Sequence, residues 1–515
     1  MKNMKKVFVL FILFFAGTVS YAQSWVNDAR TLFQNNRAVV LTVNLRNFAA
    51  VDNDGNGIIQ PSKGDINGNF LNSISRLDEI SKMGINTIHL LPINPVGIKR
   101  AYGTAGSLFA VKDLTNLNSD FKSPDSSMII ELQAKSFVEA CHNRNIRVLV
   151  ELPAYASYDL YLKKPGLFLK DNSRNSVIPY NSRDLRILNG GTSYHLNTAV
   201  YNMYKKYIDL LLSLDVDGVV VQDPYTRPVK FWSELISYTR AQNNEFLFLA
   251  EMTPGWHKSV SKYLPFVTFS GLLNSGFDAF YANFNSVQEW KSSKDLFKQL
   301  SINNKYVSRY KDKKSVAGVF ASYNDLSPIL VNDTYLSKMI IWLNSTLPVN
   351  PVYLDGFQFG DDYSYPWANL RAYDSRTDCD TYFVNRGKFD LYNFSRRPQG
   401  HYSDITQEFV KGNKFKAYMY DYLPNGKLIR LSANHESIFA YAVTDVTTNY
   451  TVFVIGSFDL ENIHNVEISV PKISQKYSLD TVRSIAVPQI KRNKIFTVIA
   501  PADIQVFVAK GFSIK

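Results

Sequence analysis

The chain has 515 residues, of which 45% are hydrophobic and 20% are charged, as is ordinary for a soluble globular protein with two or three cores. This composition excludes a disordered or fibrous chain. The formal net charge is +12, yet basic residues form no concentrated cluster beyond short pieces such as residues 311–314. A solvated basic surface explains that charge better than nucleic-acid binding does.

The first 22 residues have the features of a secretory signal peptide. Three lysines precede an apolar run at residues 7–16, and Ser20-Tyr21-Ala22 places small residues at the −3 and −1 positions of a cleavage site. We therefore expect a mature chain that starts at Gln23, carries a net charge of +9 and is secreted or periplasmic. The alternative is an uncleaved anchor, but the apolar run is short for a bilayer span.

Helical stripes alternate with buried strands over about the first 360 residues. The clearest stripe runs from Val200 to Leu211, directly before the apolar strand 217–222, and similar pairs occur at 71–93 and 130–150. Repeated helix–strand units predict an α/β architecture with parallel strands. Residues 153–196 are rich in Tyr, Asn, Ser, Lys and Gly, which indicates an irregular insertion. Alternating segments beyond residue 410 predict a C-terminal antiparallel β domain.

Four of the predicted strands end in a carboxylic acid or its amide. The runs end at Glu151, at Gln222 and Asp223, at Glu251, and at Asp325. The carboxyl ends of parallel strands meet at one edge of a sheet or barrel, so these side chains are expected to share one rim.

The order of these segments resembles the α-amylase family of glycoside hydrolases, family 13. Residues 106–113 are similar to the family's GSPYxVxDY segment, and residues 138–151 resemble its third strand with the helix before it. The resemblance implies a (β/α)8 TIM barrel, an inserted domain and a C-terminal β-sandwich. The implied division is a signal peptide at 1–22, a barrel at 23–152 and 197–409, an inserted domain at 153–196 and a sandwich at 410–515.

A retaining glycosidase of this family needs a carboxylate nucleophile about 5 Å from a protonated acid. The resemblance places Glu251 on the general acid and Asp325 on the aspartate that binds sugar hydroxyls. It places Gln222 on the nucleophile and Val220 on the arginine that keeps that nucleophile ionised. An amide is a far poorer nucleophile than a carboxylate, so the resemblance implies impaired hydrolysis.

Asp223 is the alternative nucleophile, one residue beyond Gln222. Side chains alternate along a strand, so Asp223 is expected to face away from the rim unless a bulge shifts the register. Other family positions also differ, because Tyr155 and Ala156 replace an Asn-His pair. The candidate substrate contacts, with core packing as the alternative for each aromatic ring, are Phe109, Tyr155, Tyr323, Asn324 and Trp256.

The segment Asp52-Asn-Asp-Gly-Asn-Gly-Ile58 has oxygen ligands at positions 1, 3 and 5 and glycine at position 6, as a calcium loop requires. Lys63 at position 12 excludes a complete EF-hand. We expect Ca²⁺, against a plain Asn/Gly-rich turn, at Asp52, Asp54, Asn56, Ile58 and Asp65. The cysteines, Cys141 and Cys379, form a pair only in an oxidising compartment, and the helical stripe favours a buried thiol for Cys141.

Three functions remain open from the sequence. The first is an amylase-like protein that binds an α-glucan or oligosaccharide and hydrolyses it poorly. The second is an active α-glucosidase or transglycosidase that uses Glu251 with a rearranged nucleophile such as Asp223. The third is a non-catalytic scaffold that binds a protein partner.

Overall fold

The computed structural model describes residues 28–54, 59, 61–101, 107–179, 182–254, 263–310, 312–321, 328–360, 403–471, 477–484 and 486–514. Eight parallel strands close into a barrel in the order β1-β10-β9-β8-β7-β6-β3-β2. The strands are β1 (Val40–Val43), β2 (Thr87–Leu90), β3 (Arg147–Leu152), β6 (Gly218–Gln222), β7 (Leu247–Glu251), β8 (Ala279–Tyr281), β9 (Ser315–Val319) and β10 (Asn350–Leu354). The predicted (β/α)8 barrel is therefore confirmed.

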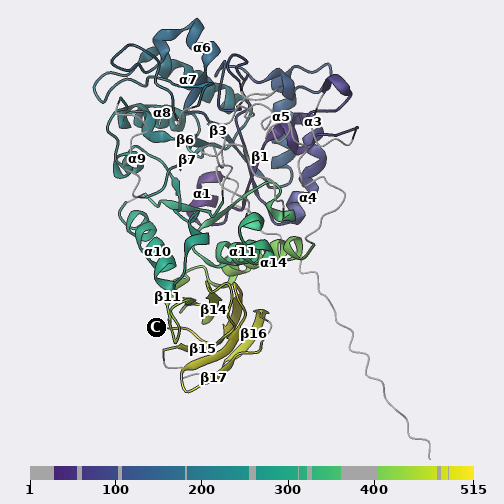
Figure 1. Cartoon of the computed structure of the whole chain (residues 1–515), viewed down its shortest axis with the longest axis vertical. Helices are drawn as coiled ribbons and strands as arrows, with labels where there is room; N and C mark the ends of the chain where they lie inside the picture. The colour runs from purple at the N-terminus through teal and green to yellow at the C-terminus, as the bar shows by residue number, and fades with distance from the viewer. Residues whose placement is uncertain are drawn as a thin grey trace, which may run out of the picture.

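Helices surround this barrel (Figure 1). They are α1 (Ala29–Gln34), α2 (Leu45–Phe48), α3 (Phe70–Ser73), α4 (Leu77–Lys82), α5 (Ile130–His142), α7 (Thr198–Ser213), α8 (Val229–Gln242), α9 (Phe269–Asn274), α10 (Ser293–Val307), α11 (Pro328–Thr346) and α14 (Ser403–Tyr422). Helix α7 shows why helical spacing of apolar residues predicts these helices correctly. The Asn197 side chain caps its first turn, and its apolar stripe from Val200 to Leu211 is buried. No helix among the described residues is both long and apolar enough to cross a bilayer.

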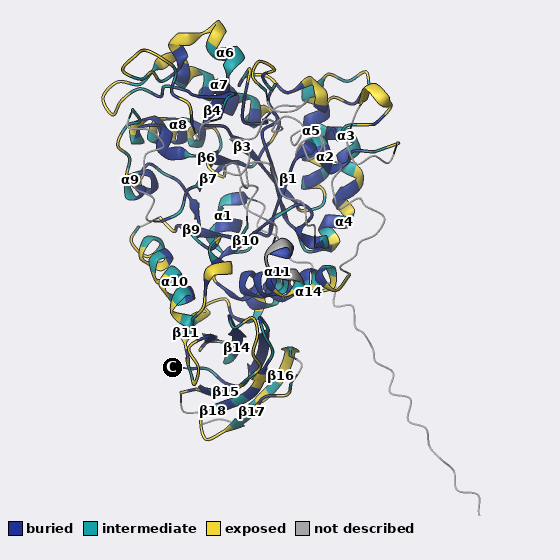
Figure 2. Ribbon diagram, in the orientation of Figure 1, coloured by how far each residue is buried: buried dark blue, intermediate teal, exposed yellow. Residues whose placement is uncertain are grey.

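Strand β6 shows how closely the strands approach one another. All five of its residues are buried, and a Cβ on Gly218 would lie 2.6 Å from the Leu247 carbonyl oxygen of β7. Glycine is therefore required at this position. Figure 2 shows the barrel strands as buried, with the exposed residues on the surrounding helices and loops.

The segment between β3 and α7 contains a small two-stranded sheet. Strands β4 (Tyr155–Ser157) and β5 (Leu185–Ile187) pair antiparallel beside helix α6 (Tyr158–Lys163). This sheet lies within residues 153–196, where the sequence indicates an insertion.

Two antiparallel sheets form the C-terminal region, as the sequence predicts. One sheet has the order β11 (Lys427–Arg430), β13 (Ile438–Asp445), β14 (Tyr450–Ser457), β19 (Ile504–Lys510) and β16 (Ser478–Arg483). The other has the order β12 (Ser432–Ala433), β15 (His464–Ser469), β18 (Lys494–Ile499) and β17 (Gln489–Lys491). A shared apolar core joins the two sheets.

Helices α11 and α14 lie between the barrel and these sheets (Figure 1). Helix α14 continues across residues 409 and 410, the boundary expected from the sequence, and the first strand of the sheets begins at Lys427. The Asn413 amide donates to the Met83 carbonyl, and Thr346 bonds to the Tyr441 hydroxyl. These buried contacts join α14 to the barrel, and α11 to the sheets.

Candidate active site

The ends of β3, β6 and β7 place acids and an amide side by side at the carboxyl rim of the barrel. In the register of these parallel strands, Glu151 is opposite Val220 and Gln222 is opposite Glu251. Val220 packs in the apolar cluster inside the barrel, so residues two apart from it on the same strand face inward as well. Glu151, Gln222 and Glu251 therefore share the inner face of the rim.

A buried hydrogen-bonded chain runs along this rim from β1 to β3. The Thr42 hydroxyl lies 3.1 Å from His89 Nδ1, and His89 Nε2 lies 2.7 Å from Glu151 Oε2. The Glu251 side chain is close enough to Glu151 to lower the pKa of Glu151. The carboxyl groups of Glu151 and Glu251 therefore lie together beside this chain, in a buried part of the rim.

Burial controls the ionisation of this chain. It raises the pKa of Glu151 well above the usual value for a glutamate, and the negative charge of Asp223 raises it further, whereas the neighbouring Glu251 side chain lowers it. Burial also lowers the pKa of His89 to about 3. Tyr281, at the end of β8, has a pKa raised by burial and by the charges of Glu251 and Glu151. The rim is therefore a desolvated acidic site in which the neutral imidazole of His89 does not supply a positive charge.

Gln222 is tied to the backbone of the neighbouring loop. Its Oε1 accepts a hydrogen bond of 3.1 Å from the Ala154 N–H, and its side chain is buried. The Ala154 carbonyl accepts another, of 2.7 Å, from the buried Arg227 guanidinium. The Gln222 amide therefore helps to hold the segment that follows β3.

Asp223 does not face away from the rim, which corrects the expectation from strand alternation. Strand β6 ends at Gln222, and Asp223 has a left-handed backbone with φ of 41° that precedes the 3₁₀ turn η5 (Pro224–Thr226). The Tyr155 and Tyr225 hydroxyls both donate to its carboxylate, the latter over 2.7 Å. Alternation holds only while the backbone is extended, so the left-handed residue redirects the side chain.

The predicted sugar contacts divide into two groups. Phe109 and Tyr155 are 4% and 1% exposed and pack in one apolar cluster. Neither ring presents an open face to a ligand in this structure. Trp256, Tyr323, Asn324 and the third predicted carboxyl, Asp325, lie outside the described residues.

Sequence reasoning missed His89, Tyr225 and Tyr281 as parts of this site. His89 had a visible signal, because it is the only ionisable residue within the strand 87–90. Charged or polar residues inside a buried strand require a partner, and such a position therefore merits attention. The two tyrosines had no comparable signal in a chain with 14% aromatic residues.

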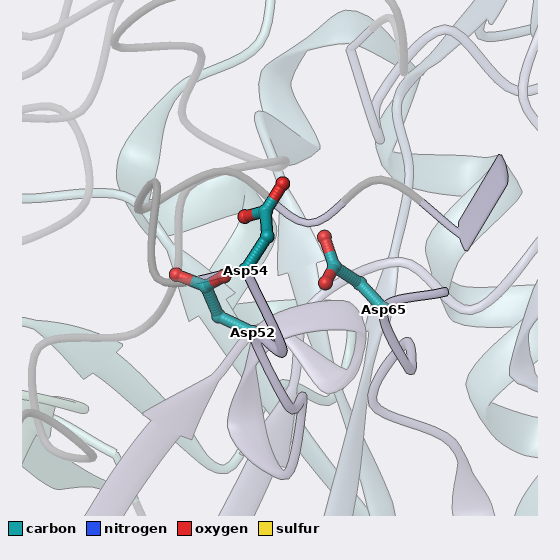
Figure 3. A group of neighbouring side chains, drawn as sticks. All are labelled: Asp52, Asp54 and Asp65. Atoms are coloured by element: carbon teal, nitrogen blue, oxygen red, sulfur yellow. The ribbon is translucent and has the colours of Figure 1, made fainter. Parts of the chain in front are cut away.

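Three of the predicted calcium ligands converge at a loop that follows α2. Asp52, Asp54 and Asp65 each offer a carboxylate oxygen, and these oxygens lie within 4.8 Å of one another (Figure 3). Two backbone hydrogen bonds between Val51 and Ile66 close the loop. Asn56 and Ile58 lie outside the described residues. Clustered hard oxygen ligands fit Ca²⁺. Asp65 brings a third carboxylate oxygen to this cluster, which the ammonium group of Lys63 could not supply.

Cys141 is a free, buried thiol on α5, as the helical stripe predicts. Burial raises its pKa far above the usual value for a cysteine, which makes the thiol unreactive. Cys379 lies outside the described residues.

Comparison with known proteins gives one sequence family and one fold. The chain is 23% identical over 199 residues to an alpha-1,4-glucan:maltose-1-phosphate maltosyltransferase of Bifidobacterium animalis, and the match covers 36% of this chain and 27% of that protein. It is 24% identical over 247 residues to the maltosyltransferase of Corynebacterium glutamicum, with coverage of 45% and 34%. The chain thus spans about a third of the length of these curated relatives. No protein-family model matches it.

The solved structures with a similar fold cover nearly the whole chain. The maltogenic alpha-amylase AmyB of Thermotoga neapolitana superposes with a TM-score of 0.67 at 16% identity, over 94% of this chain and 99% of that one. The trehalose-6-phosphate hydrolase of Bacillus licheniformis gives 0.65 at 12% identity, over 93% and 100%. The resemblance to the α-amylase family is thereby confirmed, and these structures establish the fold alone.

Proposed function

We propose that this chain, which has the fold and the relatives of the α-amylase family, is a secreted or periplasmic protein that binds α-glucans and hydrolyses them poorly. The observation that carries the proposal is Gln222, directly opposite the acid Glu251 in the register of β6 and β7. An amide cannot replace a carboxylate as nucleophile, and a loss of about five orders of magnitude in rate corresponds to about 7 kcal/mol of barrier.

The surroundings of Gln222 support the same proposal. The arginine position is occupied by the buried Val220, so a carboxylate at residue 222 would lack the cation that stabilises it. Glu251 lies beside the buried Glu151 inside the rim, and no positive charge from the neutral His89 balances these two acids. Secretion is supported by the signal-like residues 1–22 of the sequence.

Parallel assays of binding and hydrolysis test this proposal. Purified mature protein is offered starch, glycogen and maltooligosaccharides, and bound sugar and released reducing ends are followed together. We expect saturable binding, with turnover far below the roughly 1–10³ per second that is typical of enzymes. Turnover in that range would refute impaired hydrolysis. Absence of both binding and turnover would favour the scaffold alternative, in which the barrel binds only a protein partner.

The position of Asp223 favours a second candidate, an active α-glucosidase or transglycosidase. Its left-handed backbone and the two tyrosine donors hold a carboxylate beside Glu151 at the rim. This candidate requires turnover that is lost both in Asp223→Asn and in Glu251→Gln. Tyr225→Phe is the matched control, because it removes one hydrogen bond and leaves the carboxylate. Turnover that persists in Asp223→Asn would exclude Asp223 as the nucleophile.

We also propose that Asp52, Asp54 and Asp65 hold a calcium ion. The support is the convergence of three carboxylates in a loop closed by the bridge between Val51 and Ile66. The ion would fasten this loop to the adjacent barrel elements, and it takes no part in the chemistry derived above.

A further inference from the structure

A cavity of about 670 Å³ lies at the end of the barrel opposite the acidic rim. Its barrel lining comes from residues 35–37, from Lys313 and from residues 345–348, which precede β1, β9 and β10 respectively. The remaining lining comes from α14, from the turn that follows it and from β11 and β13. The cavity therefore lies between the amino end of the barrel and the C-terminal sheets, where α11 and α14 are seen in Figure 1.

Among the described residues, the charged side chains that line this cavity are all basic. Four basic side chains contribute to the lining, and none of the lining residues is Asp or Glu: Arg37, Lys313, Lys416 and Lys427. Neutral polar side chains fill much of the remaining lining: Asn35, Asn36, Ser345, Thr346, Tyr420 and Asn425. A concave site lined by cations concentrates a positive potential and attracts anions.

Lys416 is the most deeply placed of these cations. Its side chain is 4% exposed, and its Nζ donates over 2.7 Å to the Leu347 carbonyl, just beyond the end of α11. Burial lowers the pKa of Lys416 to about 7. Within the part of the chain that the structure describes, no carboxylate forms an ion pair with it. An ammonium has three donors, and the Leu347 carbonyl takes one of them.

A purely structural role explains only part of this arrangement. A buried lysine at the end of α11 binds carbonyl oxygens that the helix leaves unpaired, which is a common stabilising contact. That role requires one cation and explains neither the additional basic residues nor the absence of acids in the described lining. An uncompensated buried ammonium costs free energy, and a bound anion removes that cost.

We propose that this cavity binds a phosphate ester of a hydroxylated small molecule, such as a sugar phosphate. The phosphate would lie among Lys416, Arg37 and the two exposed lysines, because charge-assisted hydrogen bonds from Lys and Arg are the strong contacts for a phosphate. The hydroxyl groups would meet the asparagine, serine and threonine side chains. The volume is in the range of about 300–1,000 Å³ of small-molecule sites, whereas inorganic phosphate would leave most of it unfilled. The proposal is independent of the chemistry at the rim.

Calorimetric titration of the purified full chain tests the proposal with three probes: glucose 1-phosphate, inorganic phosphate and glucose. We expect saturable binding of glucose 1-phosphate that weakens as salt is added, weaker binding of inorganic phosphate, and none of glucose at this site. Equal affinity for inorganic phosphate would overturn the assignment to an ester. No saturable binding of either phosphate would overturn the site itself.

Two exposed lysines allow the site to be located without disturbing the core. Lys313→Gln with Lys427→Gln should weaken glucose 1-phosphate binding at least about tenfold. The double variant Lys122→Gln with Lys491→Gln removes two exposed lysines away from the cavity and should bind like the native protein. Equal loss in both double variants would show a general charge effect and overturn the proposal. Lys416→Met, checked for folding by circular dichroism, should abolish binding, and unchanged affinity would exclude this cavity.

Discussion

A carboxylate introduced at residue 222 should destabilise this protein. Gln222 and Glu251 are opposite one another on adjacent strands, and adjacent strands lie about 4.8 Å apart. Glu151 lies beside Glu251, and Asp223 is close enough to raise the pKa of Glu151. Gln222→Asp therefore adds a carboxylate to an acidic site whose neighbouring inward-facing residue on β6 is the apolar Val220.

The size of this effect follows from the spacing. Two unit charges about 5 Å apart at an effective dielectric of about 20 repel by about 3 kcal/mol. Gln222→Asn is the matched control, because asparagine is as short as aspartate and also lacks the full reach of Gln222 to the Ala154 N–H. We therefore expect the free energy of unfolding of Gln222→Asp to be about 3 kcal/mol lower than that of Gln222→Asn at neutral pH.

Urea unfolding followed by tryptophan fluorescence measures this difference, because Trp232 on α8 and Trp342 on α11 are buried in the folded protein. The repulsion raises the pKa of the new aspartate in the folded state above its unfolded value of about 3.9. The penalty is then complete above the folded pKa and disappears as the pH falls below the unfolded pKa. Equal stability of the two variants at neutral pH would refute the electrostatic reasoning, and hydrolysis gained by Gln222→Asp would show that the arginine is dispensable.

Three further outcomes follow from the structure. A chelator should lower the melting temperature of the native protein but not that of the double variant Asp52→Asn with Asp54→Asn. The reason is that an ion present at about 100 times its Kd stabilises the folded protein by about 2.7 kcal/mol. An unchanged melting temperature of the native protein would argue against calcium. Above about pH 7, Lys416 is neutral in the folded state and charged in the unfolded state. The free energy of unfolding of the native protein, relative to that of Lys416→Met, should therefore rise by about 2 kcal/mol between about pH 7 and about pH 9. Parallel pH profiles of the two proteins in urea unfolding would contradict this. Gly456→Ala places a Cβ 2.0 Å from the Phe439 ring and should lower the free energy of unfolding by about 1–3 kcal/mol. Gly166→Ala, whose Cβ would have no atom within 4 Å, should leave it unchanged. Thermal unfolding of both variants in a calorimeter measures the difference.

The barrel and the C-terminal sheets could be predicted because their signals are local in the sequence. The stripe from Val200 to Leu211 has helical spacing, and the run that ends at Gln222 is apolar over strand length. The acids at strand ends were also predictable, since parallel strands bring their carboxyl ends together. The direction of Asp223 was not, because it depends on one left-handed residue at the end of β6.

The sequence by itself determined the architecture and the residues that meet at the rim, including the amide of Gln222 and the acid of Glu251. Only the tertiary structure decided which of them touch: His89 with Glu151, Glu151 with Glu251, and Asp223 with two tyrosines. It also gathered the four basic residues of the cavity from segments up to 390 positions apart, Arg37 to Lys427. The physical reason is that apolar periodicity acts between near neighbours in the chain, whereas hydrogen bonds and charge proximity require the closed barrel and its packing against the C-terminal sheets.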